Sequence, residues 1–184
     1  MVIAYLSILI IIIIILGLIE SYFHKSHLKK IPIRVHVNGA RGKSSVTRLV
    51  ASGLRESKKK VYAKTTGSSP RIIDDLGNDI VIHRLRSASI GEQVKLIRSL
   101  AKKEIDILII ECMAVQPQYQ WVSERKMIKS SIGVMTNVRL DHLDEMGYSL
   151  NDIAMSLSNT IPDNGTFITH DDKYSSLFSS ISKK

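Results

Sequence analysis

The sequence predicts an α/β fold of the P-loop kind: a mostly parallel sheet with helices on both faces, preceded by one transmembrane helix. Three observations lead to this prediction. Short apolar runs alternate with longer stretches whose apolar residues recur at helical spacing, as in chains that build a parallel sheet. The short runs are apolar throughout, which is typical of strands covered on both faces. Residues 36–45, HVNGARGKSS, stand between the first run and the first helical stretch, where a phosphate-binding loop belongs.

The elements follow from the spacing of their apolar residues. In the first predicted helix of the domain, Val46, Leu49, Val50 and Leu54 share one face. The predicted strands are Ile33–Val37, Val61–Lys64, Ile80–His83, Ile107–Ile110, Ile132–Met135 and Thr166–Thr169. The predicted helices are Lys43–Glu56, Ser89–Lys103, Tyr119–Lys129 and Asn151–Thr160. The tail Ser175–Lys184, rich in serine and lysine, is expected to be frayed.

The N-terminal segment is predicted to be an uncleaved membrane anchor. No charge occurs from Val2 to Ile19, and a helix of this length extends roughly 27 Å at about 1.5 Å per residue, close to the roughly 30 Å of a bilayer core. A signal peptide would need a basic start and a small-residue cleavage site, and a core helix would need a polar face. We therefore expect a transmembrane anchor over residues 1–20, a basic linker over residues 21–31 and one nucleotide-binding domain over residues 32–184.

The positive charge is concentrated next to this anchor. Up to residue 64 there are twelve Lys and Arg against two Glu, whereas from residue 65 onward fourteen basic residues face fifteen acidic ones. Lys25, Lys29, Lys30 and Arg34 directly follow the apolar run, which by the positive-inside rule predicts a cytoplasmic domain. The three lysines are expected to meet anionic headgroups. Nucleic acid is not expected as a partner, because aromatic residues are 5% of the chain and none interleaves with Lys58–Lys60.

Cys112 is the only cysteine, so no intrachain disulfide can form, which fits a reducing compartment. Its apolar neighbours favour a buried small residue over a reactive nucleophile.

The loop of residues 38–45 has the composition of a phosphate cradle. Gly39 and Gly42 allow the backbone N–H groups to approach phosphate oxygens, and the following helix adds a partial positive charge. Lys43 is placed to reach the β- and γ-phosphates, and the Ser44 hydroxyl to ligate Mg²⁺. The full Walker pattern is not met, since Val37 stands where its first glycine would be. An ordinary glycine turn before a capped helix is therefore the alternative.

Further polar residues follow two other predicted strands. Glu111 comes directly after IDILII, and Thr136, Asn137, Asp141, His142 and Asp144 follow the strand Ile132–Met135. Because the carboxyl ends of parallel strands meet at one edge, these side chains are expected near the phosphate loop. Glu111 is predicted to hold Mg²⁺, and His142 to be a metal ligand oriented by a carboxylate. The alternatives are a helix N-terminal acid and an exposed loop histidine.

Four strings carry a family resemblance: HVNGARGKSSVTRL, AKTTGSSPR, IIECMAVQPQ and TNVRLDHLDEMG, in this order behind the apolar helix. Together they resemble the ATP-dependent ligase subunits of bacterial poly-γ-glutamate synthases, which are relatives of the Mur ligases and folylpolyglutamate synthetases. The likeness runs from about Ile33 to Phe167 and implies the fold of the Mur ligase central domain.

The resemblance also implies roles for individual residues. It places ATP, with Mg²⁺ or Mn²⁺, at the loop of residues 38–45, and Lys43, Glu111 and His142 become the catalytic residues. The implied metal ligands are Ser44, Glu111 and His142. The implied nucleotide-binding residues are Asn38, Gly39, Ala40, Arg41, Gly42, Lys43, Ser44, Ser45, Thr65, Thr66, Gly67 and Asn137.

The implied reaction transfers the γ-phosphate of ATP to a glutamate side-chain carboxylate, and an incoming amine then displaces phosphate to leave a γ-amide bond. Glutamate or poly-γ-glutamate is the implied substrate, and other membrane subunits of a synthase are the implied partners, at the bacterial cell membrane. Family members continue into a C-terminal domain, so we expect a truncated product, one part of a split protein or a fragment. A non-catalytic membrane subunit and a different membrane-anchored P-loop ATPase remain alternatives.

Overall fold

The computed structural model describes residues 2–67, 69–83 and 89–182. Within these residues, seven strands form one sheet in the order β4-β3-β2-β5-β1-β6-β7. The five strands β1, β2, β5, β6 and β7 pair in parallel, whereas β3 pairs antiparallel with β2 and with β4. The strands are β1 Ile33–Asn38, β2 Val61–Thr65, β3 Arg71–Ile73, β4 Asp79–Val81, β5 Ile107–Glu111, β6 Ile132–Met135 and β7 Thr166–Thr169.

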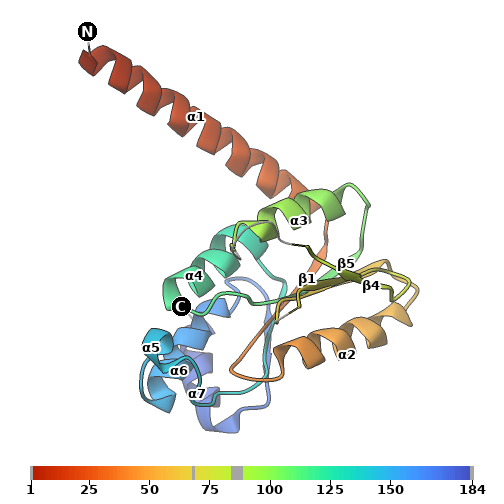
Figure 1. Ribbon diagram of the computed structural model, residues 1–184. Helices are drawn as coiled ribbons and strands as arrows, with labels where there is room; N and C mark the ends of the chain where they lie inside the picture. The colour runs from red at the N-terminus through yellow and green to blue at the C-terminus, as the bar shows by residue number, and fades with distance from the viewer. Residues whose placement is uncertain (1, 68, 84–88, 183–184) are drawn as a thin grey trace.

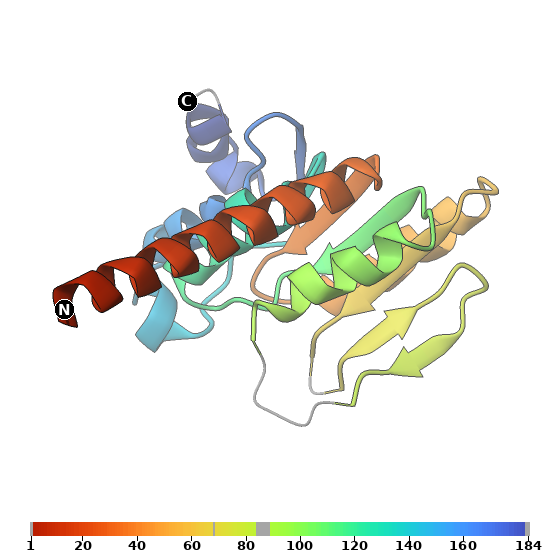
Figure 2. The same ribbon diagram turned by 90° about the horizontal axis from the view of Figure 1, so that it is seen from above.

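Helices lie on both faces of the sheet (Figures 1 and 2). Helix α2 covers one face, and α3, α4 and the end of α1 cover the other (Figure 1). A third cluster joins α5, α6 and α7 to the end of β6. The helices are α1 Val2–Lys29, α2 Lys43–Arg55, α3 Glu92–Ala101, α4 Pro117–Val122, the π-helix η1 Ser123–Ile128, α5 Leu143–Met146, α6 Leu150–Leu157, the 3₁₀ helices η2 Ser158–Thr160 and η3 Asp172–Tyr174, and α7 Ser175–Ser182.

The central strand β1 is not apolar throughout. Val35 and Val37 pack in the core beneath α2, as expected. Arg34, His36 and Asn38 point to the other face and hydrogen-bond with residues of the helical segments there. The prediction that the parallel strands are uniformly apolar is therefore wrong for β1.

Most predicted elements are confirmed, and β6 and β7 have the predicted bounds. The predicted helix Tyr119–Lys129 is helical as α4 followed by the π-helix η1, to Ile128. Two expectations are wrong. The tail forms helix α7, because Phe178 is buried against the domain. On α2, Leu49 is exposed, and only its neighbours Val46, Val50 and Leu54 pack on the core.

The residues expected to form a linker are largely helical. Helix α1 continues without a break to Lys29, because the last two turns have a buried side formed by His24 and Leu28. Its apolar part has no buried residue and a mean hydropathy of 3.3, so it is long and apolar enough to cross a membrane. Strand β3, which sequence reasoning missed, extends the sheet beyond β2.

Candidate functional site

The loop between β1 and α2 has the backbone that only glycine adopts readily. Gly39 has φ +134° and Gly42 has φ +81°, both in the left-handed half of conformational space. A Cβ at Gly39 would lie 2.1 Å from Thr136 Oγ1, whereas one at Gly42 would meet nothing within 4 Å. Gly39 thus allows β1 and β6 to approach each other, and Gly42 leaves open space at the N-terminus of α2.

The end of β6 holds this loop in shape. Asn137 Oδ1 accepts a hydrogen bond from the Arg41 amide (3.1 Å), and Asn137 Nδ2 donates to the Arg41 carbonyl (3.0 Å). Thr136 Oγ1 donates to the same carbonyl (2.7 Å), and the Ala40 amide donates to the Asn137 carbonyl (3.0 Å). The two residues predicted at this strand end therefore order the loop. A direct contact of Asn137 with a nucleotide stays a prediction.

Helix α2 begins at this loop without a side-chain cap. Its N-cap residue, Gly42, has no side chain to accept hydrogen bonds from the first-turn N–H groups. Uncapped N–H groups and the helix dipole together favour an anion at this end. Lys43 Nζ donates to the carbonyls of Gly39 (2.7 Å) and Ala40 (3.3 Å), so its charge lies over the loop. The loop thus offers positive potential to a phosphate.

Glu111 connects this loop to the end of β2. Its Oε2 atom accepts hydrogen bonds from Ser44 Oγ (2.8 Å) and from the Thr66 amide (2.7 Å). A Cβ at Gly67 would lie 3.7 Å from Ser44 Oγ, so the segment Thr65–Gly67 lies next to Ser44. Contact of this segment with a nucleotide stays a prediction. Helix α4 begins only at Pro117, so Glu111 is not a helix N-terminal acid. The structure brings Ser44, Glu111 and Thr66 together.

His142 is placed at the same edge but apart from this group. It is exposed, precedes α5 and has φ +48°. Among the described residues, its ring makes no hydrogen bond with Ser44 or Glu111, and no group of three His, Cys, Asp or Glu side chains could hold a metal. The neighbouring aspartates bond elsewhere, Asp141 with Arg41 (3.1 Å) and Asp144 with Tyr148 (3.1 Å). Metal binding by His142 stays a prediction.

A cavity of about 310 Å³ opens beside the loop. Its lining combines Arg41 and Gly42 of the loop, Thr136 and Asn137, and His170 after β7. Sequence reasoning missed His170, although it too follows a parallel strand and so lies at this edge. A second cavity of about 390 Å³ lies against α7, away from the loop.

The residues beneath the loop form a buried polar layer. The Asn38 side chain points into the interior, where Nδ2 donates to Gln120 Oε1 (2.8 Å) and Thr160 Oγ1 (3.1 Å). Only its backbone faces the loop region, since its carbonyl accepts from the Thr136 amide. This geometry does not favour nucleotide binding through the Asn38 side chain. The buried polar layer instead supports the loop from below.

His36 and Glu124 form a second part of this layer, with a distance of 2.7 Å between His36 Nδ1 and Glu124 Oε2. Burial by itself lowers the pKa of His36, but the neighbouring Cys112 and Glu124 raise it to about 9. Burial raises the pKa of Glu124, but His36 and the hydrogen bonds from Ser130 outweigh this and hold it below its ordinary value. Both pKa shifts favour the charged forms of the pair, an imidazolium beside a carboxylate. Cys112 is 2% exposed, which confirms the prediction of a buried residue.

Comparison with known proteins identifies the family. Residues 37–184 match the Mur ligase middle domain. The chain is 41% identical to the capsule biosynthesis protein CapB of Bacillus anthracis over 93% of this chain and 37% of that protein. It is 35% identical to the PGA synthase CapB of Bacillus subtilis (strain 168) over 94% of this chain and 44% of that protein. It therefore spans less than half the length of these relatives.

The solved structures agree with the fold. E. coli FolC in complex with DHPP and ADP superposes with a TM-score of 0.62 at 16% identity, over 89% of this chain and 44% of that one. The predicted α/β fold and the resemblance drawn from the four sequence strings are confirmed. An unrelated P-loop ATPase is no longer an alternative. The chain belongs to the Mur ligase family, whose middle domain it matches from residue 37 onward.

Proposed function

We propose that this chain is the ATP-binding part of a membrane-associated ligase that forms γ-glutamyl amide bonds. The observation that carries the proposal is the contact of Ser44 and Glu111 directly beneath a glycine loop that holds Lys43. The relatives named as a capsule biosynthesis protein and a PGA synthase support glutamate or poly-γ-glutamate as the substrate. Other membrane subunits of a synthase are the partners in this proposal.

The residues present fit ATP with a divalent cation. The open space at Gly42, the uncapped start of α2 and the ammonium of Lys43 suit the phosphates. The hydroxyl of Ser44 and the carboxylate of Glu111 are oxygen donors, which Mg²⁺ prefers, and Mn²⁺ accepts the same set. The FolC structure has the same fold and contains ADP, which supports a nucleotide as the ligand. His142 is proposed as an additional ligand.

The chemistry follows from charge. A carboxylate is a poor electrophile, and the bound nucleotide would supply the phosphoryl group that activates it for attack by an amine. Lys43 and the N-terminus of α2 would neutralise the phosphates, so that the anionic carboxylate can approach them. Glu111 and Ser44 would fix the cation. This chain's own contribution is therefore positioning and charge neutralisation.

The place of the protein is part of the proposal. Helix α1 is proposed to cross the cell membrane once, with the nucleotide domain in the cytoplasm. The support is the apolar run followed by Lys25, Lys29 and Lys30, since basic residues flank the cytoplasmic end of such helices.

Binding of ATP by the detergent-solubilised full chain tests the proposal. We expect Lys43→Ala to weaken binding of a fluorescent ATP analogue with Mg²⁺ by at least about tenfold, because a charge-assisted contact of about 1.5–3 kcal/mol is lost. The matched control is Lys59→Ala, an exposed lysine after α2, which should bind as the parent does. Glu111→Gln should chiefly reduce the gain in affinity that Mg²⁺ provides. Equal binding by the parent and Lys43→Ala would overturn the proposal.

A further inference from the structure

A group of exposed cations lies where α1 meets the nucleotide domain. It consists of Lys25 and Lys29 of α1, Lys30 directly after it, and Arg98 and Lys102 at the end of α3. We call this group the basic collar. In the described part of the chain, none of the five side chains forms an ion pair with a carboxylate. The collar is thus free to bind an anion from outside.

The two helices that carry the collar are fixed to each other. Leu28 of α1 is buried in one core cluster with Ile97, Leu100 and Ala101 of α3. His24 Nε2 hydrogen-bonds with the carbonyl of Met127 (2.7 Å), which ties α1 to η1 as well. Figures 1 and 2 both show α3 alongside the domain end of α1. The collar therefore has a defined shape.

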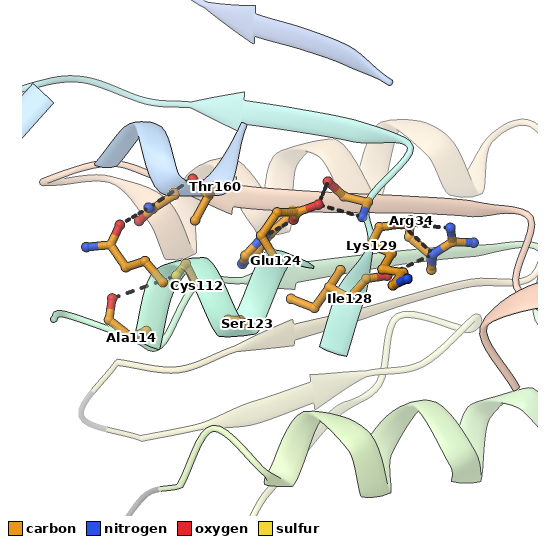
Figure 3. Close-up of polar contacts among 12 residues, drawn as sticks. Arg34, Cys112, Ala114, Ser123, Glu124, Ile128, Lys129 and Thr160 are labelled. Carbon is orange, nitrogen blue, oxygen red and sulfur yellow. Dashed lines mark hydrogen bonds and ion pairs between the residues drawn. The ribbon is translucent and has the colours of Figure 1, made fainter. Parts of the chain in front are cut away.

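Arg34 strengthens the contact between α1 and the domain. Its guanidinium donates to the carbonyls of Leu28 (3.2 Å), Ile128 (3.0 Å) and Lys129 (2.7 Å). It thereby joins the end of α1 to the end of η1. Figure 3 shows Arg34 beside Ile128 and Lys129.

The cations of the collar act on one another. Lys30, Arg98 and Lys102 all lie close enough to the His27 ring for their charges to affect it. Like charges gathered in this way repel, and a bound anion relieves the repulsion. A surface of this kind is typical of sites that meet phosphate groups.

The sequence places the collar at the depth of lipid headgroups. Tyr22 and Phe23 are exposed and pack edge to face with their ring centres 5.9 Å apart, directly after the apolar run. Aromatic residues favour the membrane interface. At a rise of about 1.5 Å per residue, Lys25 to Lys30 lie about 5–12 Å beyond Tyr22. That distance is comparable with the screening length of about 8 Å at physiological salt.

We propose that the basic collar binds the headgroups of anionic phospholipids and so holds α3 against the membrane surface. The inference rests on α1 crossing the membrane, which belongs to the proposed function. The continuity of the collar with the apolar helix favours a lipid over a nucleic acid as the source of the phosphates. The consequence is a nucleotide domain with one preferred face toward the bilayer.

The test uses the full chain in vesicles of phosphatidylcholine, alone or mixed with phosphatidylglycerol. Ser99→Cys places a fluorophore on the exposed face of α3, and Cys112 is too buried to react with the label. A trace of lipid with a quencher on its headgroup reports the distance of α3 from the surface. We expect stronger quenching when phosphatidylglycerol is present, and reversal of this gain by high salt.

The double variant Arg98→Gln, Lys102→Gln should lose most of the increase in quenching that phosphatidylglycerol produces. At about 1 kcal/mol per cation, the loss of two cations weakens binding of the collar to headgroups roughly thirtyfold. The matched control Lys58→Gln, Lys59→Gln removes two exposed lysines that follow α2 and should keep the gain. Unaltered circular dichroism shows that each variant is folded. Headgroup binding by the collar would be overturned by equal quenching in both kinds of vesicle. It would also be overturned if Arg98→Gln, Lys102→Gln kept the increase in quenching.

Flotation with phosphatidylcholine vesicles is measured first. A chain that fails to float contradicts the membrane placement of α1, and with it the collar. A chain that floats but shows no dependence on phosphatidylglycerol contradicts the collar alone. Neither result bears on ATP binding at Lys43.

Discussion

The two faces of β1 are built from opposite kinds of residue. On one face, Val35 and Val37 pack with Ile109 beneath α2, in a core of aliphatic side chains. On the other, Arg34, His36 and Asn38 are engaged in hydrogen bonds. The apolar face is stabilised by the hydrophobic effect, which depends on the buried apolar area and not on the direction of individual contacts. The polar face depends on specific partners.

Each polar side chain of β1 has a different partner. Arg34 joins the ends of α1 and η1, whereas His36 contacts Glu124 within η1. Asn38 reaches Gln120 of α4 and Thr160 of η2. Glu124 and Thr160 are labelled in Figure 3. Buried polar groups are costly unless they are paired, so each pair admits few alternative positions of its helix. The comparison teaches that one face of β1 supplies stability, while the other fixes where the helices beside the phosphate loop lie.

The largest effect is expected where the polar face loses one member of a charged pair. Glu124→Ala leaves His36 Nδ1 and the amide and hydroxyl of Ser130 without their buried partner and should cost about 3–5 kcal/mol. The urea midpoint of the detergent-solubilised chain measures this loss. Replacing both members, as in His36→Leu with Glu124→Met, should recover much of the stability. A loss below about 1 kcal/mol for Glu124→Ala would show that the pair does not hold η1.

The same pair should make stability depend on pH. The pKa of His36 rises from 6.5 to about 9 on folding, so its contribution is complete below pH 6.5 and disappears as the pH rises toward 9. The pKa of Glu124 is lowered, so its contribution exists above its ordinary value of 4.5 and is lost as the pH falls further. We expect a loss on the order of 3 kcal/mol between pH 6.5 and 9.

Thermal unfolding across this pH range measures the slope. His36→Gln should be less stable than the parent at pH 6.5 but much flatter between pH 6.5 and 9. An identical slope in the two proteins would assign the pH dependence to other groups.

The smallest effect is expected on the apolar face. Ile109→Val removes one methylene from a fully buried side chain of β5 and should cost about 1 kcal/mol. This loss should be independent of pH, in contrast to that of the charged pair. Urea unfolding of Ile109→Val at pH 6.5 and at pH 9 checks both statements. If Ile109→Val lost as much stability as Glu124→Ala, the two faces of β1 would not differ in the way described.

The parallel core and the centre of the site could be predicted from local sequence. Strands β6 and β7 are short segments rich in β-branched or apolar residues between turn residues, and this pattern predicts their bounds. Ser44 and Glu111 were expected together because the carboxyl ends of parallel strands share an edge, and the structure joins them at 2.8 Å. The order of the parallel strands is enough to predict that Ser44 and Glu111 lie close together.

The remaining features depend on contacts between distant residues. His36 and Glu124 are 88 positions apart, and nothing near either residue in the sequence indicates the other. Helix α7 contains five serines, and its burial rests on Phe178 meeting Phe167 of β7. The helical turns over Tyr22–Lys29 resemble a linker in composition, and only their packing on α3 and η1 shows the buried side.

The unbroken course of α1 has a mechanical consequence. From Val2 to Lys29 the helix has no hinge, and its last turns are locked to the domain. Where α1 crosses a bilayer it acts as a lever arm: a thicker bilayer makes such a helix more upright, and a thinner one increases its tilt. Because the last turns of α1 are packed on the domain, a change in the tilt of the helix would turn the domain with it.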